Sequence, residues 1–326
     1  MAGHSFAKLA LTAALAGLAA GNPLPAGAQS RFKSGVDMVP LTVTVTDVKG
    51  RPITGLTGGD FQIFEDGVEQ SLAFFAAAEV PVDVALVIDT SSSMRLTLPV
   101  VQKAACGLLR TLHAGDRGAV VEVKDAVRIP QPLTSDLGLL ETSVHALRAS
   151  GGTALYDGLY VMLKEFDRAH ASQDVRRQVL ILLSDGLDTR SHLPADEVME
   201  LARRVGVNIY VIALQGEAVP VPRSEQDESV LHAQYEMRTV AREAGGQAFF
   251  PRSAAELPAI YETIAQELAS QYQLGYVPKR SGGDGDFRRV AVRLATNGLA
   301  RTRSGYYASR AAGSRSNVPA RAGGAQ

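Results

Sequence analysis

The chain has 326 residues, of which 46% are hydrophobic and 21% charged, and its formal net charge is −1. This composition excludes a largely disordered chain and suits about two globular domains of roughly 150 residues each. The near-neutral charge, without a basic patch interleaved with aromatic residues, argues against a general nucleic-acid-binding protein.

The N-terminal residues 1–28 have the features of a secretory signal peptide. Lys8 precedes an apolar segment at 9–20, and Ala26-Gly27-Ala28 supplies the small residues that signal peptidase requires. The apolar segment is too short to span a bilayer comfortably. We therefore expect an exported protein, periplasmic or secreted, with no membrane span after cleavage. A retained membrane anchor is the alternative.

Cys106 is the only cysteine, so we expect no internal disulfide. It lies in the segment 99–113, whose apolar residues follow helical spacing. We interpret it as a packed helix residue, with a reactive thiol as the alternative.

The first part of the mature chain is predicted to be all β. Residues 39–46 alternate apolar and hydroxyl side chains, the pattern of a half-buried strand. A second strand is predicted at 60–65, and Asp66-Gly67 makes a tight turn into 68–75, which indicates a hairpin. A unit of this size is too small to be stable alone.

From residue 82 the pattern changes to alternating strands and helices. This order of elements predicts a Rossmann-like, doubly wound α/β fold with a mostly parallel sheet between helices. A short antiparallel strand is predicted at 126–129, and Ser253 and Glu256 form a capping box at the start of the final helix. The predicted parallel strands are 82–89, 118–123, 179–184, 207–214 and 247–250, and the helices are 99–113, 137–149, 154–169, 194–205, 234–244 and 253–271.

After the final helix the β pattern returns. Strands are predicted at 272–277, 287–294 and 299–303, with Asn297-Gly298 as a hairpin turn. We expect the two β segments to pair into one small sandwich-like domain into which the α/β domain is inserted. The predicted boundaries are 36–80 and 272–308 for the β-domain, 81–271 for the α/β domain, and 309–326 for a disordered tail.

Three loops carry short oxygen side chains next to predicted strand ends, where open α/β sheets place their sites. The first follows the buried strand 82–89 and has hydroxyls at alternate positions after its terminal acid: Asp89, Ser91 and Ser93. The second contains Gly152-Thr153, and the third contains Ser184-Asp185. Carboxylates with hydroxyls suit a hard cation such as Mg²⁺, Mn²⁺ or Ca²⁺ better than zinc.

The pattern Asp-x-Ser-x-Ser, followed by a distant Thr and a distant Asp, resembles a von Willebrand factor type A (VWA) domain with a metal-ion-dependent adhesion site. The resemblance implies a divalent cation, first of all Mg²⁺, and a partner protein whose Asp or Glu side chain binds to it. The implied ligands are Asp89, Ser91, Ser93, Thr153 and Asp185, some of them through water.

Nearby polar residues are expected to support these ligands. Asp157, Asp188 and Thr189 lie close to the predicted site in the sequence and are candidates for holding the ligand loops. Their alternative interpretation is as ordinary polar residues of a helix start and a loop.

The flanks extend the resemblance over nearly the whole mature chain. They resemble bacterial exported proteins related to the von Willebrand factor A domain. The matching phrases are Leu-Thr-Gly-Gly-Asp-Phe at 56–61, Glu-Asp-Gly at 65–67, Gln-Leu-Gly-Tyr at 273–276 and Arg-Ser-Gly-Tyr-Tyr at 303–307.

A catalytic role is the competing interpretation. A phosphatase of the haloacid dehalogenase type needs a second Asp two residues after the first, and that position is Ser91. The sequence has no Gly-x-Ser-x-Gly elbow, no Walker loop and no histidine spacing typical of a triad. We therefore expect an exported, metal-dependent protein-binding module rather than an enzyme. The alternatives are a structural or assembly component of a cell-envelope complex and, less favoured, a metal-dependent hydrolase.

Overall fold

The computed structural model describes residues 38–77, 80–169, 176–185, 188–214, 226–280 and 285–308. The predicted signal peptide at 1–28 and the predicted tail at 309–326 lie outside these residues. Within the described part, none of the helices combines the length and the apolar character needed to cross a bilayer.

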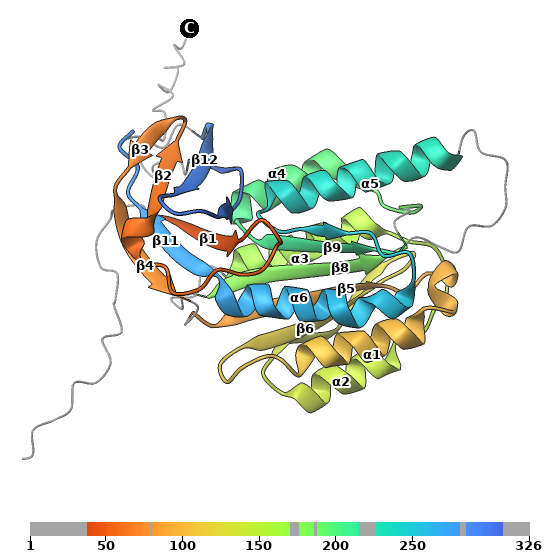
Figure 1. The fold of residues 1–326 in the computed structure, drawn as a ribbon. Helices are drawn as coiled ribbons and strands as arrows, with labels where there is room; N and C mark the ends of the chain where they lie inside the picture. Colours follow the sequence, from red (N-terminus) through yellow and green to blue (C-terminus); the bar gives the residue numbers. More distant parts are fainter. Residues whose placement is uncertain are drawn as a thin grey trace, which may run out of the picture. The chain divides into compact units, whose positions relative to one another are not determined.

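A six-stranded sheet occupies the middle of the α/β part, in the order β10-β9-β8-β5-β6-β7 (Figure 1). Every residue of β5 and β8 is buried, as expected for strands covered on both faces. Only β7 is antiparallel, so the predicted mostly parallel sheet is confirmed. The strands are β5 (Val82–Asp89), β6 (Arg117–Val123), β7 (Val127–Thr134), β8 (Arg177–Ser184), β9 (Asn208–Ala213) and β10 (Ala248–Phe249).

Helices cover both faces of this sheet. Helices α1 (Leu98–Leu109), α2 (Leu137–Ala146) and α6 (Leu257–Ser270) bury their apolar residues in one core cluster. The opposite cluster contains α3 (Leu155–Ala169), α4 (Ala195–Val205) and α5 (Gln226–Glu243). This three-layer arrangement is the predicted α/β architecture.

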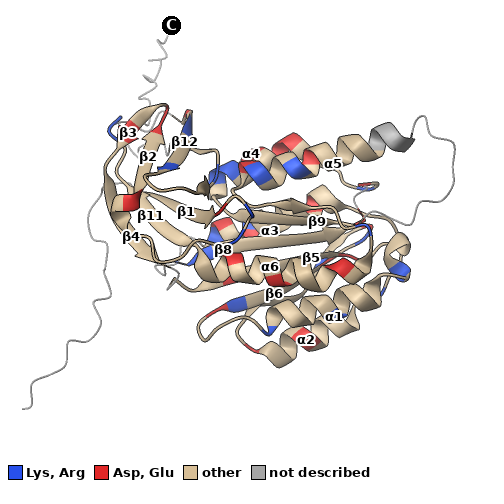
Figure 2. Ribbon diagram, viewed as in Figure 1, with Lys and Arg blue, Asp and Glu red and all other residues tan. Residues whose placement is uncertain are grey.

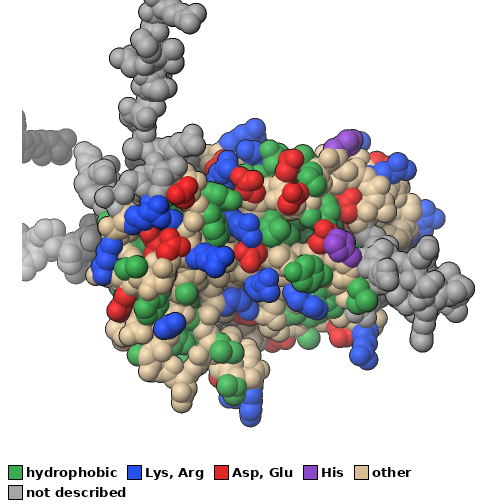
Figure 3. Space-filling view, turned by 90° about the horizontal axis from the view of Figure 1, so that it is seen from above, with side chains coloured by type: hydrophobic (Ala, Val, Ile, Leu, Met, Phe, Trp, Pro, Cys, Tyr) green, Lys and Arg blue, Asp and Glu red, His purple; other side chains and the backbone are tan. Residues whose placement is uncertain are grey.

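Charged residues lie mainly on the helices and loops, whereas β9 carries none (Figure 2). On the face seen in Figure 3, acidic and basic side chains are interleaved with hydrophobic ones. No extended surface of one sign is visible there, in keeping with the near-neutral net charge.

The rest of the described chain forms two antiparallel four-stranded sheets, in the orders β13-β1-β11-β4 and β14-β12-β2-β3. Strands from both ends of the chain pair with each other, and apolar residues of both sheets share one core cluster. The predicted domain boundaries themselves stay a prediction. The strands are β1 (Val39–Thr46), β2 (Phe61–Glu65), β3 (Val68–Gln70), β4 (Leu72–Ala77), β11 (Tyr272–Tyr276), β12 (Phe287–Leu294), β13 (Leu299–Arg301) and β14 (Gly305–Tyr307).

Two predicted β connections are wrong in detail. The segment 68–75 is not one strand: β3 pairs with β2, and the chain then breaks at Ser71 so that β4 joins the other sheet beside β11. Asn297-Gly298 does not close a hairpin, because β12 pairs with β2 and β14 whereas β13 pairs with β1. Gly298 also lacks the positive φ that a two-residue type I′ turn requires.

The helix predictions differ from the structure mainly at the ends. Helix α1 ends at Leu109 instead of residue 113, and α5 begins at Gln226 instead of 234. The predicted capping box is confirmed: Ala255 N donates to Ser253 Oγ at 3.1 Å, and Ser253 N donates to Glu256 Oε1 at 3.1 Å. Cys106 is buried in α1, which confirms its assignment as a packed helix residue.

A partly buried ion pair joins α6 to the antiparallel sheets. Arg301 Nη2 of β13 lies 2.5 Å from Glu267 Oε2 of α6, and the same carboxylate oxygen accepts from Tyr210 Oη at 2.9 Å. Gln271 Nε2 donates to Tyr210 Oη at 3.2 Å. Because Glu267 is almost wholly buried, these partners must replace the water that its carboxylate loses on folding.

Replacing Arg301 should therefore destabilise the protein. Arg301→Ala leaves the Glu267 charge buried without its cation, and we expect the free energy of unfolding in urea to fall by about 3 kcal/mol. As a control, Arg168→Ala breaks a solvent-exposed pair with Glu165 and should cost less than about 1 kcal/mol. Equal losses in the two variants would contradict the importance of the pair with Glu267.

Candidate metal centre

The three predicted loops meet at the carboxyl ends of β5 and β8. From β5 the chain reaches β6 through α1 on one face of the sheet, whereas α3 on the other face leads to β8 on the opposite side of β5. The two strands therefore border the point where the strand order reverses, the usual position of a site in an open α/β sheet. Asp89 ends β5, and Asp185 directly follows β8.

The first loop holds the acid and two hydroxyls close together. Asp89 is completely buried, and its Oδ1 accepts from Ser91 N at 2.8 Å. Its Oδ2 accepts from Ser184 Oγ at 2.6 Å. Ser91 Oγ and Ser93 Oγ are 2.9 Å apart, so the two predicted hydroxyl ligands face each other. Ser91 is buried and Ser93 is exposed, which places this group at the border between core and solvent.

The second loop is fastened to the first by main-chain hydrogen bonds. Ser92 N donates to Gly151 O at 3.0 Å, and Ser150 N donates to Thr90 O at 2.8 Å. Gly151 has a φ of 75°, a conformation that glycine adopts without strain. Thr153 follows two residues later and is buried.

The third loop is fastened to the second. Thr189 N and Arg190 N both donate to Thr153 O, at 2.9 and 3.0 Å, and Thr153 N donates to Thr189 Oγ1 at 3.1 Å. Asp185 is half-buried, and its charge acts on Asp89. The structure thus brings the three loops together and places Asp89, Ser91 and Ser93 in one hydrogen-bonded group. The role of all five predicted ligands in holding a cation stays a prediction.

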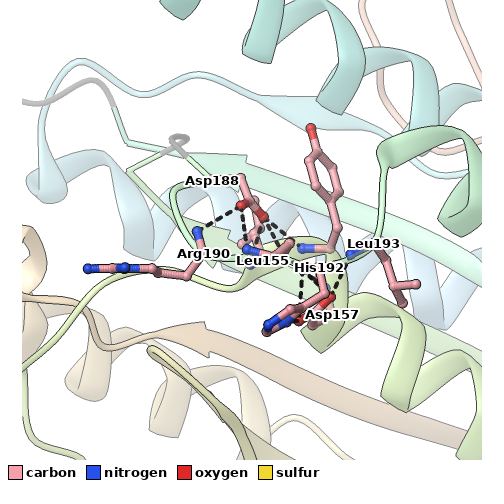
Figure 4. A network of polar contacts seen from close by, with 8 residues as sticks. Leu155, Asp157, Asp188, Arg190, His192 and Leu193 are labelled. Carbon is pink, nitrogen blue, oxygen red and sulfur yellow. Dashed lines mark hydrogen bonds and ion pairs between the residues drawn. The ribbon is translucent and has the colours of Figure 1, made fainter.

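Asp157 and Asp188 connect the start of α3 to the third loop: Asp188 of the loop binds main-chain groups of α3, and Asp157 of α3 binds main-chain groups of the loop (Figure 4). Asp188 Oδ2 accepts from the first-turn main-chain groups Leu155 N at 2.9 Å and Tyr156 N at 3.1 Å. Asp157 Oδ1 accepts from the main-chain N–H groups of His192 and Leu193, both at 3.1 Å. The two carboxylates therefore support Thr153 through the backbone, as negative charges suited to a helix N-terminus.

Ser184, named above only as part of the third loop, and Ser191 are polar residues of this region that were not predicted as site residues. Ser184 binds Asp89, and Ser191 Oγ donates to Asp188 Oδ2 at 2.5 Å. The position of Ser184, at the end of an apolar strand directly before Asp185, was a signal in the sequence. In the parallel register Ile88 pairs with Leu183, which puts Ser184 opposite Asp89. Ser191 offered no comparable pattern.

Charge balance distinguishes Asp89 from the other buried acids. Asp83, at the other end of β5, pairs with Arg117 at 2.6 Å and with Arg176 at 2.7 Å. No cationic side chain of the described residues lies within ion-pair distance of Asp89. Three of the remaining buried acids have an Arg or Lys partner: Glu65 with Arg288, Glu122 with Lys124, and Glu267 with Arg301. Asp116 lies 3.7 Å from His113, which is charged only when protonated, and accepts from two main-chain N–H groups.

Burial is also the main reason that the pKa of Asp89 is raised, against the lowering effect of hydrogen bonds from Ser184 and Ser91. Buried carboxylates are usually paired with a cation or bound to a metal. Two carboxylates with three hydroxyls are hard oxygen donors, so this set fits Mg²⁺ and similar ions. Within the described residues no three His, Cys, Asp or Glu side chains cluster as a metal site, and this candidate depends on hydroxyls for most of its donors.

The fold and the site together define an α/β protein with a candidate cation site at the reversal point of its sheet. The family model for the von Willebrand factor type A domain matches residues 83–263, more than half of the chain. The chain therefore belongs to the von Willebrand factor type A domain family. A search of curated proteins finds no match.

Several solved structures resemble the chain. A von Willebrand factor type A protein from Catenulispora acidiphila is 14% identical, with 83% of this chain and 74% of that chain covered and a TM-score of 0.48. The vWF domain of the type V pili tip protein Mfa5 from Porphyromonas gingivalis is 18% identical, with 57% and 94% covered and a TM-score of 0.47. The PilB minor pilin from Streptococcus sanguinis is 13% identical, with 58% and 61% covered and a TM-score of 0.44.

The connection between α3 and the third loop can be tested by substitution. Asp188→Ala removes the acceptor for two main-chain N–H groups at the start of α3, and we expect the free energy of unfolding to fall by about 1–2 kcal/mol. Asp167→Ala is the matched control, because Asp167 is an exposed acid near the other end of the same helix. It should change the stability by less than about 0.5 kcal/mol. A loss no larger for Asp188→Ala than for the control would contradict the connection.

Proposed function

We propose that the chain is an exported, metal-dependent protein-binding module that binds an acidic side chain of its partner through a divalent cation. The cation is held by Asp89, Ser91, Ser93, Thr153 and Asp185. The observation that carries the proposal is the buried carboxylate of Asp89, which has no basic partner among the described residues and lies beside a pair of hydroxyls 2.9 Å apart.

The donor set favours Mg²⁺ and explains why the partner is acidic. Mg²⁺ prefers six oxygen ligands, so five side chains, some acting through water, leave room for an oxygen from outside. Two carboxylates balance the two positive charges of the ion, and the remaining donors are neutral hydroxyls. A partner carboxylate therefore approaches a site without net negative charge and is attracted by the ion itself. When bound, the cation supplies the positive charge that Asp89 lacks.

The same residues favour binding over catalysis. The position where a dehalogenase-type phosphatase has its second carboxylate is Ser91, whose hydroxyl faces Ser93. A serine there lacks the carboxylate that transfers a proton in such an enzyme. Export is part of the proposal because residues 1–28 have a basic start, an apolar segment and small residues at the predicted cleavage point.

Metal binding is tested by calorimetric titration of Mg²⁺ or Mn²⁺ into the protein. Asp89→Asn keeps the shape of the side chain and removes its charge. Mutation of a residue that supports a metal ligand typically lowers metal affinity by roughly 10–100-fold. Because Asp89 is proposed as a ligand itself, we expect Asp89→Asn to lower the affinity for the ion by more than that. Asp167→Ala, which removes an exposed acid far along α3, should bind metal as the wild type does. Equal affinity in Asp89→Asn and the wild type would exclude this site.

The partner interaction is tested by capture from a cell-envelope extract with the protein immobilised in Mg²⁺. We expect a captured protein to be released by a chelator and to be absent when Asp89→Asn is the immobilised variant, because the cation joins the two proteins. Capture that persists with the chelator would show that the interaction does not use the metal.

A further inference from the structure

Arg190 is fixed beside the candidate metal centre. Its main-chain N donates to Thr153 O at 3.0 Å and to Asp188 Oδ1 at 3.2 Å. Its side chain covers Gly152: a methyl group added there would come within 2.7 Å of Arg190 Cγ and 3.1 Å of Nε. Since Gly152 directly precedes Thr153, the aliphatic part of Arg190 lies within one residue of a predicted ligand.

The side chain of Arg190 is largely exposed, so its guanidinium can reach a ligand in solution. The side chain is 65% exposed, and its ion pair within the described residues is a long one, 3.6 Å from Nε to Asp125 Oδ1. That oxygen already accepts from Gly152 N at 2.9 Å, so Asp125 is held mainly by the backbone. In Figure 4 the Arg190 side chain points away from the cluster formed by Asp157 and Asp188.

Charge decides which ligand suits this arginine. With a divalent cation bound, Asp89 and Asp185 are balanced, and the exposed groups around the centre determine its sign. Arg190 and Asp125 are exposed, as is Arg95, two residues after Ser93. The nearby acids Asp157 and Asp188 already accept hydrogen bonds from main-chain N–H groups. A guanidinium binds a carboxylate through two parallel hydrogen bonds, a geometry that an ammonium group does not provide.

We infer that Arg190 determines specificity by binding a second carboxylate of the partner, so that the module selects a segment with two neighbouring acidic residues. One carboxylate binds the cation, and the other replaces the long contact between Arg190 and Asp125. This inference rests on the proposed function, because it takes the metal-bound carboxylate as given.

The test compares two immobilised Gly-Ser peptides, one with a single Glu and one with two adjacent Glu residues, by biolayer interferometry in Mg²⁺. We expect the wild-type chain to bind the two-Glu peptide about fivefold more tightly, the upper range for an exposed ion pair. Arg190→Ala should bind both peptides equally, and Arg190→Lys should retain only part of the preference.

Arg168→Ala is the matched control. Arg168 is an exposed arginine in the last turn of α3, about 20 Å along the helix from its start, so this variant should keep the full preference. A preference that survives in Arg190→Ala, equal wild-type affinity for the two peptides, or no wild-type binding to either would overturn the inference.

Failure of the inference is distinguishable from failure of the proposed function. If Asp89→Asn or a chelator abolishes binding to both peptides, the result reports on the cation. If only the preference for the two-Glu peptide is lost, the result reports on Arg190. Wild-type binding that is indifferent to both the chelator and Asp89→Asn would refute the metal-bridged mechanism, and the inference with it.

Discussion

The buried charge of Asp89 is the constraint on which the candidate centre depends. Strand β5 is covered on both faces and has an acid near each end, but among the described residues only Asp83 has basic partners, Arg117 and Arg176. An unpaired buried carboxylate costs several kcal/mol, so the end of β5 at Asp89 is stable as an anion only if another positive charge is supplied. Asp89 accepts from the main-chain N of Ser91 and the hydroxyl of Ser184, and the hydroxyls of Ser91 and Ser93 lie in the same loop. Main-chain hydrogen bonds join this loop to the other two. The centre thus has a deficit of positive charge that a divalent cation fits.

The antiparallel sheets contact the α/β part at the opposite end of its strands. Helix α4 directly precedes β9, and arginines in its last turn lie over aromatic rings of the antiparallel strands: Arg203 over Phe287 at 5.3 Å and Arg204 over Tyr307 at 5.5 Å. The pair of Arg301 with Glu267 adds a partly buried connection to α6. These contacts gather at the amino ends of the parallel strands. They therefore lie at the end of the sheet opposite to the loops after β5 and β8 that form the candidate centre.

Sequence periodicity was enough to predict the central sheet, because a short apolar run such as Val82–Asp89, covered on both faces, differs clearly from the helices between the strands. The antiparallel part was harder. Local residues favour a turn at Asn297-Gly298, but whether the next strand returns to the same sheet depends on pairing with β1, more than 250 residues earlier. For the centre, Asp89 and Asp185 could be chosen from their positions after apolar strands. That Asp89 has no basic partner in the described part of the chain could not be predicted without knowing which loops lie together. The same holds for the reciprocal contacts of Asp157 and Asp188.

The carboxylates of the candidate centre bear on which partners it could distinguish. If Asp89 and Asp185 together neutralise a divalent cation, the ligands themselves distinguish poorly between one acidic partner and another, since every Asp or Glu offers the same carboxylate. Discrimination must then come from groups around the cation that touch the rest of the partner. Arg190 is suited to this because its backbone is held by Thr153 and its guanidinium is exposed. An exposed ion pair contributes little to the affinity when it forms alone. When a carboxylate of the same partner is already bound to the metal, the ion pair forms within the complex, and its contribution multiplies the binding constant. Selectivity in this protein would therefore depend on the spacing between two acids of the partner, and the cation would determine only that an acid is required.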